Sequence, residues 1–241
     1  MPVKAYNTRI LVDEFDFSGD TKGITLALTR EALDASVLQT AGAILVPDLG
    51  SGVLDLNGYF GATVGAGALE QELQARMESE ADCIVSAIFD TTAVGNPAYV
   101  QPTTWGKQLS IDGNDKLLMI KAQWEDLTQR GLVVAHATIA ATGDQSVIDF
   151  GAAGAAGGWA VLHVRAIVGA AVNAAFTAKS SAVVGFTSPT THGTFTISAV
   201  GASRLTFAGA VGRYMRLGCT SLGGATSLEV TAIFGVSGVT G

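Results

Sequence analysis

A succession of short apolar segments, separated by turn residues, constrains the fold more than any other feature of this sequence. In residues 53–60, Leu54, Leu56 and Phe60 alternate with polar side chains, which is typical of a strand buried on one face. Residues 83–89 are almost entirely apolar, as expected of a strand buried on both faces. Such segments follow one another at intervals of roughly 8–15 residues, with glycine, proline, asparagine or aspartate between them. The pattern predicts a mainly β chain.

One segment, residues 68–79, departs from this pattern. Its apolar residues recur at four-residue steps from Leu69 to Met77, and glutamates and glutamines fill the positions between them. A single helix among short strands is typical of a sheet or barrel that one helix covers. We expect the helical acids, Glu70 and Glu78 among them, to form an exposed polar face or to line a wet space.

Charge is divided unevenly along the chain. Residues 1–130 hold 18 acidic and 9 basic side chains, whereas residues 131–241 hold 3 acidic and 5 basic ones. Together with turn residues near position 142, this asymmetry predicts two domains: residues 1–142, which contain the helix, and residues 143–241, a second β-rich half that resembles a β-sandwich. A surface with so few charges needs a cover, and further copies of the chain would supply it most simply.

Net charge and hydropathy argue against several classes of protein. The net charge of −7 is unfavourable for a general nucleic-acid binder. No segment offers the roughly 20 consecutive apolar residues that a membrane-spanning helix needs. Residues 1–17 carry acids where a signal peptide would have an apolar core. We therefore expect a chain without a membrane segment or a secretion signal.

Motifs that would carry catalysis or bind a cofactor are missing from the sequence. It contains no G-x-S-x-G, no H-E-x-x-H, no Cys-x-x-Cys and no phosphate-binding glycine loop. The cysteines, Cys83 and Cys219, are too far apart in sequence for a local metal motif, and we expect two buried thiols. The histidines, His136, His163 and His192, lack metal-ligand spacing, and we expect partly buried side chains. The chain is thus expected to be no enzyme and to use no cofactor.

Carboxylates nevertheless gather near the N-terminus. Asp13, Glu14, Asp16 and Asp20 lie within eight residues of one another. Hard cations such as calcium bind several oxygens, but the loop pattern of a calcium site is absent. Phenylalanines interleave the acids as in a strand, which favours a solvated acidic face over a metal site. A glycosidase-type carboxylate pair also stays open, although aromatic residues that could bind sugars are scarce.

The order of segments in residues 1–140 carries a resemblance to a known family. In chain order they are VDEFDFSGD, ITLALTR, the long loop 29–52, VLDLNGYF, the helix, CIVSAIFD and LLMIKAQW. This layout resembles the tail tube proteins, also called major tail proteins, of long-tailed bacteriophages. In the second half, GWAVLHVRAIVG and SLEVTAIFGV look like the β-rich second half of some of these proteins.

The resemblance implies a tail-tube-like β-barrel or sandwich with one covering helix. Subunits of this family assemble into rings whose inner strands join into a continuous barrel, and stacked rings form the channel for DNA delivery into the host cell. The partners would be copies of the chain and other tail proteins, and the location would be the phage tail of the virion, after synthesis in the host bacterial cytoplasm. DNA would pass without specific binding, because acidic walls repel phosphates. Candidate residues for subunit contacts or for the channel wall are Asp13, Asp16, Asp55, Glu70 and Glu78.

Other interpretations stay open at this point. The second half could be a second tube domain or an outward-facing decoration, and the loop 29–52 could reach a neighbouring ring. The chain could instead be a capsid decoration or a minor tail protein. It could also be a carbohydrate-binding or adhesin-like module, for which Trp159 and Tyr214 are the aromatic candidates in the second half. Finally, it could be an enzyme of unrecognised type.

Overall fold

The computed structural model describes residues 8–18, 21–29, 32–34, 45–47, 51–59, 69–78, 82–89, 93–104, 106–114, 117–170 and 173–237. These residues form a mainly β structure of antiparallel sheets with one short helix, so the expected fold class is confirmed. By compactness the chain divides into two units. The first comprises residues 1–19, 83–100 and 129–241, and the second comprises residues 20–82 and 101–128.

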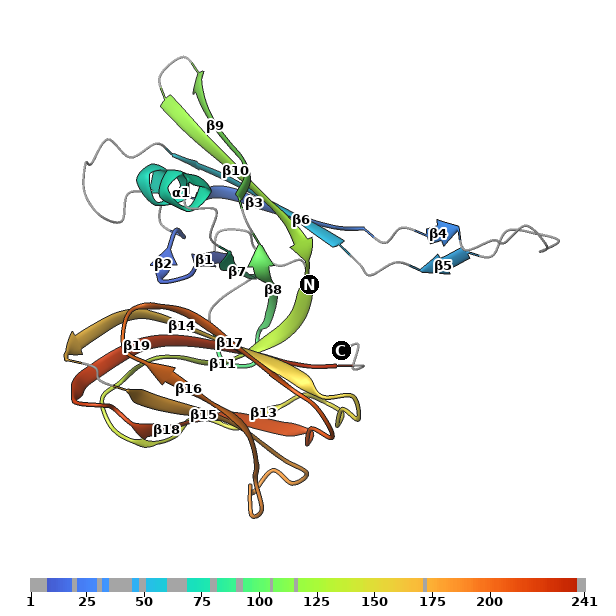
Figure 1. Ribbon diagram of the computed structural model, residues 1–241, viewed down its shortest axis with the longest axis vertical. Coiled ribbons are helices and arrows are strands. Elements are labelled where there is room, and N and C mark those ends of the chain that lie inside the picture. The colour runs from blue at the N-terminus through green and yellow to red at the C-terminus, as the bar shows by residue number, and fades with distance from the viewer. Residues whose placement is uncertain are drawn as a thin grey trace. The chain divides into compact units, whose positions relative to one another are not determined.

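The first unit contains two sheets that pack face to face (Figure 1). The larger sheet has the strand order β17-β14-β19-β11-β8-β7-β1-β2. Its strands are β1 (Arg9–Val12), β2 (Phe15–Asp16), β7 (Cys83–Ile88), β8 (Pro97–Thr104), β11 (Gln129–Ile139), β14 (Gly158–Gly169), β17 (Gly201–Phe207) and β19 (Ala225–Val236). The smaller sheet consists of β12 (Gly143–Asp144), β13 (Ile148–Asp149), β15 (Ala174–Ser181), β16 (Thr190–Ile197) and β18 (Tyr214–Ser221).

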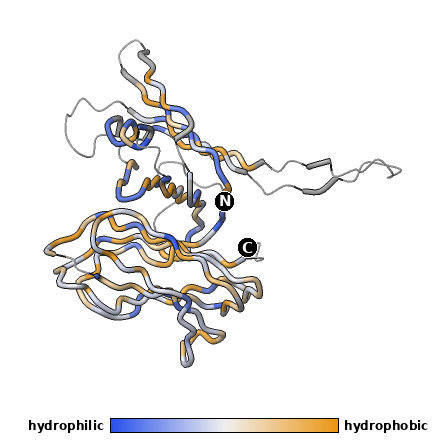
Figure 2. The backbone as a smooth tube through the Cα atoms, viewed as in Figure 1, coloured by the Kyte–Doolittle hydropathy of each residue, from blue (hydrophilic) through white to orange (hydrophobic). Residues whose placement is uncertain are grey.

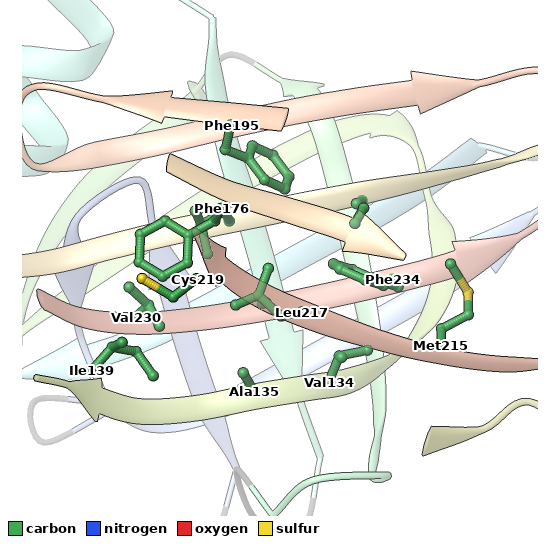
Figure 3. Close-up of a cluster of buried hydrophobic side chains, with 14 of the residues drawn as sticks. Val134, Ala135, Ile139, Phe176, Phe195, Met215, Leu217, Cys219, Val230 and Phe234 are labelled. Atoms are coloured by element: carbon green, nitrogen blue, oxygen red, sulfur yellow. The ribbon is translucent and has the colours of Figure 1, made fainter. Parts of the chain in front are cut away.

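A hydrophobic core fills the space between these two sheets (Figure 3). Phe176 lies at its centre, where it is paired in register with Phe195 on β16 and with Cys219 on β18. The larger sheet contributes Leu162, Val230, Phe234 and their neighbours from β14, β19 and β11. Burial of Cys219 and Cys83 confirms the expectation of two buried thiols.

The opposite face of the larger sheet is buried too. Trp159, Val161 and Ile233 point to this side, where they pack with Leu11 from β1 and with Ile84 and Ile88 from β7. The sheet therefore curls, so that β1 and β7 lie across the face of β14 and β19. His163 on β14 points to the same side as Trp159 and Val161 and is fully buried, whereas a partly buried side chain was expected.

The second unit is built on a four-stranded sheet of order β3-β6-β10-β9 (Figure 1). Its strands are β3 (Thr21–Thr29), β6 (Ser51–Tyr59), β10 (Leu117–Leu127) and β9 (Gly106–Asn114). The helix, α1 (Leu69–Glu78), confirms the segment expected at 68–79 and packs beside β9. Figure 2 shows α1 as mostly hydrophilic, and Leu73 is its buried apolar residue among those described.

Part of the loop expected at 29–52 contains a short hairpin. The strands β4 (Ala32–Asp34) and β5 (Leu45–Pro47) pair antiparallel, and the remaining residues from 30 to 50 lie outside the described residues. Among the described helices, none is long and apolar enough to cross a membrane.

The two compact units are interleaved along the sequence. First-half strands β1, β7 and β8 join the sheet that also contains β11, β14 and β19. Hydrogen bonding of one sheet therefore continues across position 142. The division into residues 1–142 and 143–241 stays a prediction, and it differs from the grouping by compactness.

Candidate functional site

The four-stranded sheet of the second unit has one apolar and one polar face. Because Leu54 pairs with Trp124 and Leu56 pairs with Ala122, these side chains share the apolar face. The intervening positions carry polar side chains, which therefore gather on the other face. Asp55 illustrates this, since it lies in register with Gln123 and its Oδ1 accepts a hydrogen bond of 2.7 Å from Nε2 of that glutamine.

A hollow of about 280 Å³ lies on this sheet. It is lined by Thr25, Asp55, Leu56, Asn57, Gln108, Ser110, Lys121, Ala122 and Gln123. Asp55 and Lys121 are the charged residues of this lining, and the other polar groups are amides and hydroxyls. The described lining of the hollow is thus hydrogen-bonding, with one acid and one base among its residues.

The edges of the same sheet are β3 and β9. Among the strands of the described residues, none pairs with the outer side of either. All neighbours in this sheet are antiparallel, so its two edge strands run in opposite directions. On the apolar face, Leu28 at one edge is 57% exposed and Ile111 at the other edge is 48% exposed. Each edge thus presents unpaired backbone groups beside a solvent-exposed aliphatic side chain.

The five candidate acids lie in different environments. Asp55 faces the hollow on the polar sheet face. Glu78 is exposed on α1 and accepts a hydrogen bond of 2.7 Å from Nε2 of Gln74, whereas the side chain of Glu70 lies outside the described residues. Asp13 and Asp16 lie in the first unit and participate in an internal polar network.

This network, here called the polar clasp, consists of Asp13, Asp16, Ser86, His163 and Arg165. His163 is fully buried on β14 and lies between β7 and the β1–β2 turn. Its Nδ1 is 2.7 Å from the backbone oxygen of Asp13, and its Nε2 is 2.8 Å from Oγ of Ser86. Burial, with a further contribution from Arg165, lowers the pKa of His163 to about 4, although the hydrogen bond to Asp13 opposes the shift.

The carboxylate of Asp13 takes part in this network as well. Its Oδ1 accepts a hydrogen bond of 2.9 Å from the backbone nitrogen of Ile84, which ties the turn to β7. The backbone of Asp13 has a φ of 49°, a left-handed conformation that aspartate adopts more readily than most residues. Asp13 is therefore a buried residue that ties the turn to β7, and no local sequence pattern indicates its long-range partners.

Asp16 joins two arginines from distant parts of the chain. Its Oδ2 lies 2.6 Å from Nη1 of Arg9 and 3.3 Å from Nη1 of Arg165. Arg165 also binds Oε1 of Glu229 on β19 at 2.7 Å. Burial would raise the pKa of Asp16, but hydrogen bonds from Ser18 and the charge of Arg9 outweigh it, so the pKa lies below its usual value.

The Ser86–His163 pair has the spacing of a nucleophile and its base, yet it offers no accessible reaction site. Both side chains are fully buried in the first unit. Oδ1 of Asp13 accepts a hydrogen bond from Ile84, and the imidazole bonds to the backbone oxygen of Asp13 and to Ser86, so no carboxylate bonds to the imidazole as in a catalytic triad. Substrate cannot reach Oγ of Ser86 in this conformation, so the pair holds strands together.

No family model matches the chain, and no curated protein sequence matches it significantly. Among solved structures, it is similar to a chain of the virion of a native gene transfer agent particle, with 8% identity, a TM-score of 0.40, and 54% of this chain and 98% of that chain covered. The SPP1 tail tube is similar at 9% identity and a TM-score of 0.41, over 54% of this chain and 78% of that chain. The SPP1 Dit protein, described as a hub adsorption apparatus of phages that infect Gram-positive bacteria, is similar at 8% identity and a TM-score of 0.37, over 95% of this chain and 98% of that chain. These scores are too low to transfer a function.

Proposed function

We propose that this chain is a structural, non-catalytic component of a phage-type tail, and specifically a tail tube subunit that assembles with copies of itself into rings. The observation that carries the proposal is the four-stranded sheet, which has two chemically distinct faces and two edges that no other described strand pairs with. The family resemblance of residues 1–140 supplies the class of assembly. The proposed location is the tail of the virion.

Strand direction supports ring formation. The edges β3 and β9 run in opposite directions, so β9 of one copy can pair antiparallel with β3 of the next. Such a contact joins two different surfaces and repeats from copy to copy, which generates a closed ring when the rotation closes. Pairing would also cover the exposed aliphatic side chains Leu28 and Ile111. Copies of the chain would thereby protect edges that otherwise promote aggregation.

The polar side chains on one face of the four-stranded sheet support a channel wall that does not bind DNA tightly. In a ring of this kind, we assign the polar face around Asp55 and Gln123 to the lumen. Tight DNA binding needs several cationic side chains aligned with phosphates, whereas Lys121 is the one cation among the residues that line the hollow. A hydrated wall without a row of cations would let DNA pass without stalling it. We correspondingly propose no cofactor and no catalytic residue.

Ile111→Arg tests the proposed edge contact. We expect the wild-type chain to form rings or tubes of uniform diameter, seen by negative-stain electron microscopy and light scattering. The arginine places a charge in the proposed contact and removes the burial of an aliphatic side chain. We therefore expect the association constant of each contact to fall at least about tenfold, with assembly lost at matched concentration.

Val184→Arg is the matched control. Val184 is 64% exposed in the turn between β15 and β16 and belongs to neither edge strand of the four-stranded sheet, so this variant should assemble like the wild type. Circular dichroism should be unchanged for both variants. Monomeric wild type at high concentration, or normal assembly of Ile111→Arg, would refute the edge contact.

A further inference from the structure

The polar clasp connects the β1–β2 hairpin to the middle of the larger sheet. His163 lies on β14 and bridges two elements at once, because Nδ1 contacts the β1–β2 turn and Nε2 contacts β7. Arg165, two residues further along the same strand face, binds Asp16 at the end of the hairpin. The hairpin is thus fastened to β14 at two points by polar groups from distant parts of the sequence.

The partners determine where the imidazole carries its proton. A backbone carbonyl can only accept, so Nδ1 of His163 donates to the oxygen of Asp13. Nε2 is then the unprotonated nitrogen, and the hydroxyl of Ser86 donates to it. The neutral ring has both nitrogens satisfied. Any additional proton must bind at Nε2, where Ser86 would have to rotate its hydroxyl hydrogen away.

Among the described residues, the hydrogen-bond partners of His163 are the hydroxyl of Ser86 and the backbone oxygen of Asp13, and neither is a carboxylate. Oδ1 of Asp13 bonds to the backbone nitrogen of Ile84, and the nearest charged group on the same strand face is the cation of Arg165. The ring is fully buried, so water cannot screen the new charge while the clasp stays closed. The hairpin forms the end of the larger sheet, where β1 also pairs with β7, so lifting it from β14 and opening this pairing is the movement that hydrates the ring.

The remaining groups around the clasp do not cancel this effect. Arg9 on β1 is bound to Asp16, and Glu229 on β19 is bound to Arg165. His136 on β11 has Nδ1 2.8 Å from Oγ1 of Thr231. Burial, then the charges of Arg165 and Arg9, lower the pKa of His136, so acid charges a second ring beside the same arginines.

The sandwich core does not depend on the hairpin. The cluster between the two sheets is made by residues from 134 to 236 and includes none from β1, β2 or β7. The apolar contacts of the hairpin lie on the opposite face of the larger sheet. There, Leu11 of β1 belongs to the same buried cluster as Trp159 and Val161. Release of the hairpin would therefore open the cluster that contains Trp159 and change its surroundings while the core around Phe176 stays packed.

We propose that the polar clasp is an acid-sensitive latch, in which protonation of Nε2 of His163 releases the β1–β2 hairpin from β14 while the sandwich core remains folded. A released His163 binds a proton below about pH 6.5, whereas the clasped ring does so only below about pH 4. Lowering the pH therefore shifts the equilibrium toward the released form between these two values. Above or below them, a change of pH leaves the equilibrium unchanged. Asp16 keeps its charge through this window, because its pKa lies below the usual 3.8. Across the window the equilibrium shifts toward release by roughly 300-fold.

Tryptophan fluorescence between pH 8 and pH 3 tests the latch on the full chain. With Trp105→Phe and Trp124→Phe as background, emission reports Trp159 alone. We expect a red shift between pH 6.5 and pH 4, while circular dichroism of the strands persists. In His163→Gln, whose amide does not titrate, this transition should disappear. His192→Gln is the matched control, since His192 bonds to Ser180 and stacks on Phe207 outside the clasp. The fluorescence transition of this variant should equal that of the background chain.

Nitrogen NMR of the imidazoles supplies a readout that needs no folded variant at position 163. At pH 8, His163 should be neutral with its proton on Nδ1, and it should titrate together with the fluorescence change. Titration without a change in Trp159 emission, persistence of the transition in His163→Gln, or simultaneous loss of strand dichroism would each overturn the latch.

Discussion

Phe176→Ala is expected to lower the free energy of unfolding by about 3–5 kcal/mol, the largest loss from any single substitution considered. Phe176 is fully buried at the centre of the sandwich core, between Phe195 and Cys219 in register (Figure 3). Removing the ring withdraws apolar surface from the core and leaves a cavity that two paired sheets cannot close. Urea denaturation followed by circular dichroism measures the change.

Phe150→Ala is the control for this prediction. Phe150 is also a phenylalanine packed against the same core, but it is only partly buried, so its truncation leaves an opening that water can fill. We expect a markedly smaller loss of stability. Equal losses at both positions would mean that Phe176 does not lie at the centre of a close-packed core.

Gly235→Ala is expected to destabilise the protein by about 1–3 kcal/mol although it adds a single methyl group. Gly235 on β19 pairs in register with Trp159 on β14, and a Cβ at this position would overlap the indole ring. Trp159 is buried in the cluster that includes Ile88 and Ile233, so the ring cannot move aside without disturbing them. The fluorescence emission of Trp159 should shift in this variant, and the free energy of unfolding should fall.

A second substitution separates this steric cause from a backbone effect. Trp159→Phe replaces the indole by a smaller ring, so the double variant with Gly235→Ala should lose less stability than the sum of the two single variants. Gly185→Ala serves as the neutral control, because a Cβ there meets only ordinary contact with Thr187. Additive losses in the double variant would contradict the proposed overlap.

Local patterns were sufficient for several elements. Four-residue steps from Leu69 to Met77 predicted the helix, and alternation in residues 53–60 predicted which side chains of β6 share a face. Both are short-range properties, because side chains repeat every 3.6 residues in a helix and every two residues in a strand. Asp55, one of the five candidate acids, lies on the polar sheet face for this reason.

Long-range pairing was beyond the same reasoning. The sequence pattern predicted that Asp13 and Asp16 lie on a solvated acidic face. In the structure, Asp13 bonds to Ile84 and Asp16 forms an ion pair with Arg165. Ser86 stands as one polar residue in an apolar strand, and only that interruption could have drawn attention to it. Its partner His163 is 77 positions away, so no local pattern connects the two.

The mainly β character, the helix and the alternation of faces could be predicted from local patterns, because they depend on the spacing of apolar residues within single segments. Tertiary structure alone decided that first-half strands β1, β7 and β8 join the sheet of β11, β14 and β19. It also decided that the clasp residues are internal and that Gly235 gives room to Trp159. Those outcomes depend on which strands become neighbours, and backbone hydrogen bonds are the same for every pair of strands. Side-chain packing between distant segments therefore selects the partners.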